Sequence, residues 1–305
     1  MKLSKAQNIL YHIVRTLFYI ISLLSMRVLY IVSDMVCPFV RAFYRRKLVR
    51  QQLTECFPEK TLQEIKAIEC AFYHQFCDLF VEIVKQFSMS REEMMRRMVF
   101  VDCNGALATF NSDQNILFLM LGHFGNWEWI ASLQYWTPGV QCSQVYHRLD
   151  NDMFDKLFLD LREQYGGECI PMRKTVRRLL QLNAGDKPVI CGMIADQQPR
   201  WDAIHHFSTF LGHDSAVFIG TEEVAKKLNS LVYYGSVSRV KRGYYECKII
   251  PISLHPNDMP DYQITDRYME LLEQDIRQHP ELWLWTHKRW TRTKEEWEER
   301  GKIRS

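Results

Sequence analysis

Three short apolar runs with helical patterns between them constrain the fold of this 305-residue chain more than any other feature. The runs cover residues 115–121, 187–195 and 230–237. The helical patterns cover residues 127–135, 152–165, 175–183 and 215–228. Strands that alternate with helices favour a parallel sheet covered on both faces. The sequence therefore predicts an α/β fold, with a mixed, mostly parallel sheet flanked by helices.

Three further elements follow from local signals. Thr61 with Glu64 three residues later forms a capping box, which predicts the start of a long amphipathic helix. The apolar segments 232–237 and 244–250 meet around Arg242 and Gly243, which predicts an antiparallel hairpin at one edge of the sheet. A last helix is expected over residues 262–278, before His279-Pro280.

Composition limits the classes of protein to consider. With 25% charged and 47% hydrophobic residues, the chain is typical of a globular protein and not of collagen, a disordered segment or a polytopic membrane protein. A net charge of +3 is too weak to indicate a nucleic-acid partner. The nine cysteines form no C-x-x-C pair, so we expect reduced thiols that are mostly buried.

The N-terminal region is apolar and aromatic from residue 9 to residue 40. Arg15, Arg27 and Asp34 interrupt it, whereas a membrane-spanning helix needs about 20 consecutive apolar residues. Apolar residues recur at helical spacing and form a wide face. This pattern predicts a membrane-associated helix that lies in the membrane interface or is tilted into it. The alternative is a buried helix followed by a solvated one.

A basic flank follows this helix, and its five cations are Arg41, Arg45, Arg46, Lys47 and Arg50. Cations beside an apolar helix favour contact with anionic headgroups on the cytoplasmic side of a membrane. We therefore divide the chain into residues 1–45, an N-terminal membrane anchor or interfacial helix with a basic flank, and residues 46–305, the α/β domain.

The first candidate site follows the apolar run 115–121, in the segment GHFGNWEW at residues 122–129. Ligands of open α/β sheets bind beyond the carboxyl ends of the strands, which is where His123 is expected. Gly122 and Gly125 would let the backbone approach a substrate. Glu128 is expected to fold back onto the imidazole and fix its tautomer, so that His123 acts as a general base on a substrate hydroxyl. The alternative is a hydrogen-bonded core histidine.

A second group of candidates follows the apolar run 187–195. If the strands are parallel, Asp196 opens onto the same crevice as His123; otherwise it caps a turn. Arg148 and Arg162 are candidates for binding a phosphate or a developing oxyanion, with surface arginines as the alternative. The sequence contains no G-x-S-x-G elbow, no P-loop and no G-x-G-x-x-G, which disfavours a serine hydrolase and nucleotide-dependent chemistry. The spacing of His205, His206 and His213 matches no standard zinc site.

Several segments together resemble a known family. They are GHFGNWEW, VYHRLDN followed by Arg162, ADQQP, FLG at residues 210–212, PELWLWTHKRW near the end and YRRKLVRQQLTECFPEK after the apolar N-terminus. In order and spacing they are similar to the bacterial late acyltransferases of lipid A biosynthesis (lauroyl and myristoyl transferases), within the lysophospholipid acyltransferase superfamily. The resemblance covers residues 10–295.

The resemblance implies an enzyme that moves a fatty acyl chain from acyl carrier protein to a hydroxyl of a glycolipid precursor of lipid A. It implies an inner-membrane location with the catalytic domain on the cytoplasmic face, and no metal or organic cofactor. His123 would be the base and Glu128 its partner. Substrate-binding or oxyanion roles would belong to Arg162, Arg148, Asp196, Gln197 and Asn126, although VYHR departs from the family's VYR block at His147.

Two other functions remain open at this stage. One is acyl transfer to another membrane lipid, such as a lysophospholipid, an amino-acid lipid or another glycolipid, with acyl-CoA as a possible donor. The other is a non-catalytic membrane scaffold, for which loss of His123 or Glu128 would be typical; both residues are present. Acyl chain length and oligomeric state do not follow from the sequence.

Overall fold

The structure, a computed structural model, describes residues 3–304. Its helices are α1 (Lys5–Ser22), α2 (Met26–Phe43), α3 (Arg46–Cys56), α4 (Leu62–Lys85), α5 (Arg91–Arg97), α6 (Cys103–Leu107), α7 (Asp152–Glu163), α8 (Thr175–Asn183), α9 (Gly220–Leu228), α10 (Gln263–Gln278) and α11 (Lys294–Arg304). Short 3₁₀ helices are η1 (Trp129–Tyr135), η2 (Met172–Lys174), η3 (Trp201–Ala203), η4 (Pro256–Asp258) and η5 (Pro280–Leu282). The strands are β1 (Met98–Val101), β2 (Ile116–Leu121), β3 (Gln141–Tyr146), β4 (Glu168–Pro171), β5 (Val189–Ile194), β6 (Phe207–Phe210), β7 (His213–Ala216), β8 (Leu231–Lys241) and β9 (Tyr244–Ser253).

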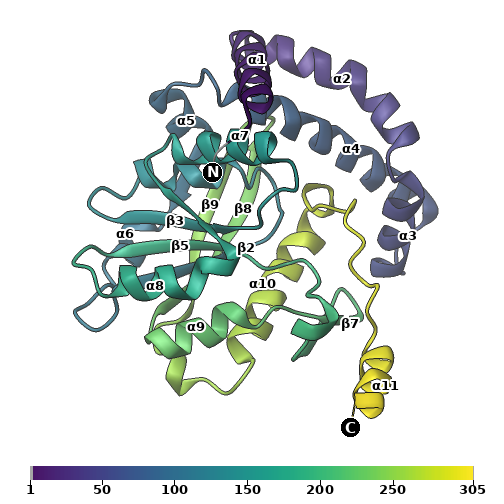
Figure 1. Cartoon of the computed structure of the whole chain (residues 1–305). Coiled ribbons are helices and arrows are strands. Elements are labelled where there is room, and N and C mark those ends of the chain that lie inside the picture. The colour runs from purple at the N-terminus through teal and green to yellow at the C-terminus, as the bar shows by residue number, and fades with distance from the viewer. Residues whose placement is uncertain (1–2, 305) are drawn as a thin grey trace.

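The main sheet has seven strands in the order β1-β9-β8-β2-β5-β3-β4, and helices flank it (Figure 1). Every neighbouring pair is parallel except β8 with β9. Strand β2 is buried at all six positions, as expected for a central strand covered on both faces. The predicted α/β fold with a mixed, mostly parallel sheet is confirmed.

The β8–β9 hairpin forms as predicted, but its predicted place at the edge is wrong. Strand β1 pairs in parallel with β9 and so lies outside the hairpin. The predicted helix at residues 215–228 begins only at Gly220, because residues 207–216 form the β6–β7 hairpin. Leu211 and Gly212 close that hairpin, both with positive φ (53° and 82°), as a tight two-residue turn requires. The segment at 127–135 is a 3₁₀ helix that starts at Trp129.

The other predicted helices of the α/β domain agree with the structure. Thr61 caps α4 in a capping box with Glu64. Helix α8 spans the predicted residues, and α7 and α10 lie within the predicted ranges. Eight of the nine cysteines are buried, and Cys70 is half-buried.

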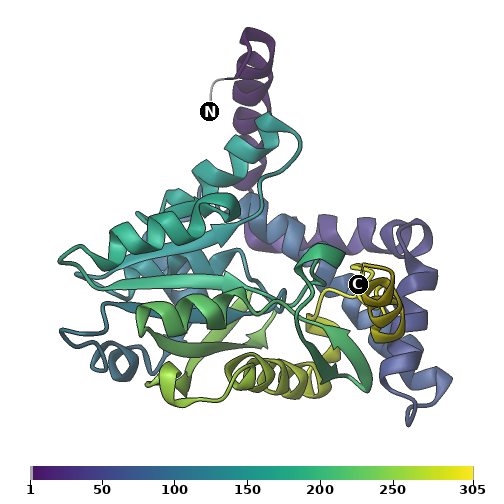
Figure 2. The same cartoon turned by 60° about the horizontal axis from the view of Figure 1, so that its bottom comes forward.

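The apolar N-terminal region is two helices and not the single helix that the sequence predicted. Ser25 interrupts it because its hydroxyl accepts a hydrogen bond from the Val28 amide and caps α2. Figure 2 shows α1 projecting from the α/β body, while α2 lies against α4. Among the described helices, none alone is long and apolar enough to cross a membrane. Taken together, α1 and α2 are long and apolar enough to cross a membrane by length and composition, but the chain bends by 109° between them.

The basic flank makes internal contacts. Arg41, Arg46 and Arg50 converge on the fully buried carboxylate of Glu69, at 3.0, 2.9 and 2.7 Å. Arg45 donates to the carbonyl of Thr286 at 2.8 Å. Four of the five cations thus have partners within the protein, so the flank secures α2 and α3 to the rest of the fold.

Candidate active site

The candidate site lies where β2 and β5 end side by side. The two strands are parallel and in register up to Leu121 and Ile194, so the residues that follow them meet at one edge of the sheet. The chain leaves β2 through His123 and β5 through Asp196. As predicted for parallel strands, Asp196 lies beside His123 at this edge of the sheet.

His123 and Asp196 form a direct pair. The imidazole Nδ1 lies 2.6 Å from Asp196 Oδ1, and the backbone amide of His123 donates to Oδ2 at 3.1 Å. The expectation that Glu128 orients the imidazole is therefore wrong, because Asp196 occupies that position. The carboxylate at Nδ1 comes from 73 positions further along the chain.

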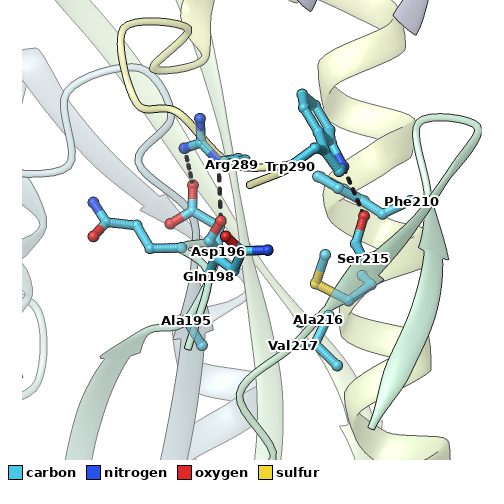
Figure 3. Close-up of a pocket in the computed structure, with 11 residues that line it drawn as sticks. Ala195, Asp196, Gln198, Phe210, Ser215, Ala216, Val217, Arg289 and Trp290 are labelled. Carbon is cyan, nitrogen blue, oxygen red and sulfur yellow. Dashed lines mark hydrogen bonds and ion pairs between the residues drawn. The ribbon is translucent and has the colours of Figure 1, made fainter. Parts of the chain in front are cut away.

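Asp196 is held by three further donors from the C-terminal segment. Trp283 Nε1 donates to Oδ2 at 2.9 Å and Arg289 Nη2 donates to the same oxygen at 3.0 Å. Arg289 Nε also donates to the Asp196 carbonyl at 3.0 Å, and Figure 3 shows the arginine lying directly over the aspartate. The guanidinium of Arg289 stacks 3.6 Å from the centre of the Trp283 ring.

These contacts fix the charge of Asp196. Burial by itself raises the pKa of this carboxyl, but His123 and Arg289 outweigh burial and hold the pKa well below its usual range. Asp196 is therefore ionised, and an ionised carboxylate only accepts hydrogen bonds. It follows that His123 carries a proton on Nδ1, which leaves Nε2 as the nitrogen that can accept one.

The second ring nitrogen of His123, Nε2, lies beside Gln197 in a partly exposed side chain. The side chain of His123 is 20% exposed. The Gln197 amide nitrogen lies 3.5 Å from Nε2, at the outer limit of a hydrogen bond, and the Trp127 ring meets the imidazole edge to face at 5.3 Å between centroids. Gln197, one of the predicted substrate-binding residues, is thus a neighbour of Nε2.

Glu128 forms a forked ion pair with Arg162. Arg162 Nε and Nη2 donate to the two carboxylate oxygens at 2.8 and 2.7 Å. Burial alone lowers the pKa of Arg162, but Glu128 reverses this and raises the pKa above its usual range. This pair joins the loop after β2 to α7, and both of its members were predicted site residues.

Asn126 and Arg148 lie in positions that differ from the prediction. Asn126 has no exposed surface, and its amide donates to the buried Glu82 at 2.7 Å. It is an anchor of the loop and has no surface to offer a substrate. Arg148 is exposed beyond the end of β3 and pairs with Asp152 and Asp155 at the start of α7.

The two glycines of the loop serve packing. A Cβ on Gly122 would lie 2.6 Å from Leu272, and one on Gly125 would lie 2.8 Å from Val237. Gly125 also has a φ of 60°. The close approach that these glycines allow is therefore to α10 and β8 and not, as the sequence suggested, to a substrate.

A small hollow of about 300 Å³, including its open mouth, adjoins the other side of Asp196. Phe210, Val217 and Met269 give it an apolar wall, and Trp290 donates to Ser215 at 2.8 Å across its rim (Figure 3). No three His, Cys, Asp or Glu side chains between residues 3 and 304 lie together in a way that would hold a metal ion. His206, one of the histidines considered for zinc, pairs with Asp266 at 2.8 Å.

A comparison with protein families decides what the chain is. The family model for bacterial lipid A biosynthesis acyltransferases matches residues 1–292. The chain belongs to this family. No curated protein matches the chain in a direct comparison. The resemblance noted in the sequence is thus confirmed, and this enzyme is an acyltransferase.

Sequence reasoning missed several residues of this candidate site. Arg289 and Trp283 hold Asp196, and the only signal for them was the aromatic and basic segment PELWLWTHKRW. His287 comes from the same segment. Burial, with the charge of Arg289, lowers the pKa of His287 to about 4, so its imidazole is neutral beside the site at neutral pH.

Backbone hydrogen bonds explain how this segment reaches the site. Gly125 donates to the Leu282 carbonyl at 2.9 Å, and Leu284 donates to the His123 carbonyl at 3.1 Å. The C-terminal segment is therefore bonded directly to the loop that carries His123.

Proposed function

We propose that this acyltransferase moves a fatty acyl chain from acyl carrier protein to a hydroxyl of a lipid A precursor, with His123 as the general base. One observation carries the mechanism: His123 Nδ1 is paired with an ionised Asp196, which leaves Nε2, beside the Gln197 amide at 3.5 Å, as the nitrogen that can accept a proton. This is the arrangement that orients a histidine base in acyl-transfer enzymes.

The reaction follows from that arrangement. Nε2 of His123 accepts the proton of the acceptor hydroxyl as the hydroxyl oxygen attacks the thioester carbonyl. The C–O bond forms, the C–S bond breaks, and the imidazolium returns its proton to the leaving thiolate. Asp196 stabilises the positive charge on His123 during the step, and Arg289 and Trp283 hold Asp196 in place.

A basic surface beside the site supports a carrier protein as the donor. Arg173, Lys174 and Arg177 follow β4, whose carboxyl end lies on the same edge of the sheet as His123. All three are exposed and have no acidic partner within the described residues. The exposed side chains of Met172 and Val176 lie among them, at 49% and 45%. Such a surface suits an acidic protein that presents an acyl thioester.

The N-terminal arm, α1 with α2, supports a membrane-bound acceptor. It exposes a large number of apolar side chains, far more than single surface residues would account for. They include Ile9, Leu10, Ile13, Leu17, Ile20, Leu23, Leu24, Val28, Ile31, Val32, Met35, Val36, Phe39 and Phe43. We propose that this face enters the inner membrane from the cytoplasmic side, where a lipid acceptor and a soluble donor meet.

Mass spectrometry of the lipid products tests the proposal. Purified protein is offered long-chain acyl carrier protein, with either a tetra-acylated lipid A precursor or a pool of lysolipids. We expect one acyl mass to be added to the lipid A precursor by the wild type and by His206→Ala, and none by His123→Ala. His206 is the matched control because it also pairs with an aspartate, away from β2 and β5.

The other outcomes separate the parts of the proposal. Acylation only in the lysolipid pool would keep the chemistry and replace the acceptor. If acyl-CoA supports the same activity as acyl carrier protein, and Arg173→Glu and Arg177→Glu leave the activity unchanged, the carrier protein is not the specific donor. Unchanged activity in His123→Ala would exclude the base.

A further inference from the structure

Glu82 on α4 is a buried carboxylate that the proposed mechanism does not use. Its side chain has no exposed surface. It accepts three hydrogen bonds, each from a different part of the fold: from the Tyr30 hydroxyl of α2 at 2.8 Å, from the Asn126 amide of the His123 loop at 2.7 Å and from the Tyr245 hydroxyl of β9 at 3.0 Å. Glu82 is thus the point where the N-terminal arm, the sheet and the site loop meet.

The contact with Asn126 determines the shape of the loop. Asn126 Oδ1 accepts from the Trp129 amide at 3.1 Å, and Trp129 Nε1 donates to the Glu82 carbonyl at 3.3 Å. Asn126 lies between His123 and Glu128 in the chain. Holding Asn126 and Trp129 on α4 therefore fixes the segment that presents both site residues.

The charged groups around Glu82 reach it only indirectly. Arg239 donates to Gln75, which donates to Tyr245, which donates to Glu82. On α4, Asp78 faces the same region, but Arg242 and Ser33 bind it. With no cation of the described residues in direct contact, burial raises the pKa of Glu82 to about 7 despite its three donors.

We propose that Glu82 is a positioning residue for acyl transfer: its carboxylate, held by Tyr30 of the N-terminal arm, anchors Asn126 and thereby places His123 and Glu128. The inference rests on the proposed function and adds a connection to it. The arm and the site share one buried hydrogen-bonded group, so a change in how α2 sits against α4 changes the geometry of the base.

A reciprocal exchange tests the contact between Glu82 and Asn126. Asn126→Asp places two carboxylates face to face in a buried site, where they must share one proton. We expect its kcat, relative to the wild type, to fall by about tenfold or more between pH 6 and pH 9 as that proton is lost. Adding Glu82→Gln supplies an amide that donates to the carboxylate introduced at position 126, so the double variant should not show this fall towards pH 9. KM for both substrates should stay within about twofold, because neither residue has surface to offer a substrate.

A pair of tyrosines tests the link to the arm. Tyr30→Phe removes the hydrogen bond between α2 and Glu82, and Tyr11→Phe removes a similar tyrosine-to-carboxylate bond between α1 and Asp160 of α7. Removing the Tyr30 donor raises the pKa of Glu82 further. We expect Tyr30→Phe to lower kcat and to move the acid limb of the pH profile upwards, while Tyr11→Phe leaves both unchanged.

The controls decide between the inference and the function on which it rests. Circular dichroism at each pH establishes that the variants are folded. A ratio for Asn126→Asp that does not vary with pH, or a fall that Glu82→Gln leaves in place, would overturn the positioning role, as would equal behaviour of the two tyrosine variants. Absence of transfer by the wild type would instead reject the proposed function. The Nε2 environment of His123, followed by NMR titration, would then still report whether Tyr30→Phe, and not Tyr11→Phe, moves the base.

Discussion

Replacing Asp196 by asparagine should disable His123 while keeping its position. Three N–H donors meet at Oδ2: the His123 amide, Trp283 Nε1 and Arg289 Nη2. The asparagine must turn its oxygen towards them, so its NH₂ group takes the place of Oδ1 and faces His123 Nδ1. That nitrogen then has to accept, which puts the ring proton on Nε2, where it blocks transfer from the substrate hydroxyl.

The size of the effect follows from the tautomer. In hydrolase triads the same exchange lowers kcat by about 10⁴-fold, which corresponds to roughly 5.5 kcal/mol of transition-state stabilisation. We expect a similar loss here, with KM little changed. The stability cost should be smaller, about 1–3 kcal/mol, because the oxygen still accepts from the buried donors.

The assay is the rate of acyl transfer at saturating donor and acceptor, measured beside a thermal melt. Asp266→Asn is the control, because Asp266 also pairs with a histidine, His206, at 2.8 Å. It should retain full activity. A folded Asp196→Asn enzyme whose kcat stays within about tenfold of the wild type would refute the assignment of Nε2 as the base.

Three further predictions concern other parts of the molecule. Glu128→Gln breaks the forked pair with the largely buried Arg162 and should lower kcat by about 10–100-fold and also lower the melting temperature. Glu128→Asp should recover part of the activity and part of the melting temperature. Equal activity of the wild type and the two variants would exclude a role for the pair. Ile31→Asp, on the exposed face of α2, should weaken sedimentation with anionic vesicles and leave transfer to a detergent-dispersed acceptor unchanged; unaltered sedimentation would remove this face from the membrane contact. Glu82 has its pKa raised to about 7 in the folded protein, so its contribution to stability is fully present below the unfolded pKa of 4.5 and is lost as pH rises through 7. Chemical unfolding of the wild type should therefore show a lower free energy of unfolding at pH 8 than at pH 5, with a smaller difference in Glu82→Gln. The same pH difference in both proteins would show that Glu82 does not titrate in this range.

The central strands β2, β5 and β8 and the meeting of His123 with Asp196 were predictable because both depend on local pattern and on one rule of sheet topology. Apolar runs bounded by turn residues identified β2, β5 and β8. Once these strands are parallel, the residues after β2 and β5 must meet.

The partner of the imidazole was not predictable in the same way. Glu128 is five residues from His123 and was favoured by nearness in sequence, whereas Asp196 is 73 residues away. Which carboxylate reaches Nδ1 depends on the turn at Gly125 and on Arg162 of α7, which binds Glu128. Neither the turn nor the Arg162–Glu128 pair can be predicted from the sequence, because both depend on how the loop packs in the folded protein.

The basic flank shows a similar limit. Five cations after an apolar helix have the composition of a headgroup-binding segment. Their partner Glu69 lies one helix further on and is fully buried, and a single sequence does not show that three arginines converge on it. The sequence shows that the cations are present, but only the tertiary structure shows that three of them bind Glu69.

The segment from Leu282 to Arg289 also sets the order in which the enzyme becomes competent during synthesis. A ribosome adds about 5–20 residues per second, so the N-terminal arm emerges well before the segment that holds Asp196. Until Arg289 has emerged, Asp196 lacks its cation and the His123 loop lacks two of its backbone partners. The nascent chain can therefore present its apolar helices while the proposed base is still unassembled. Premature termination before residue 282 would leave a protein that has the arm but not the segment that holds Asp196.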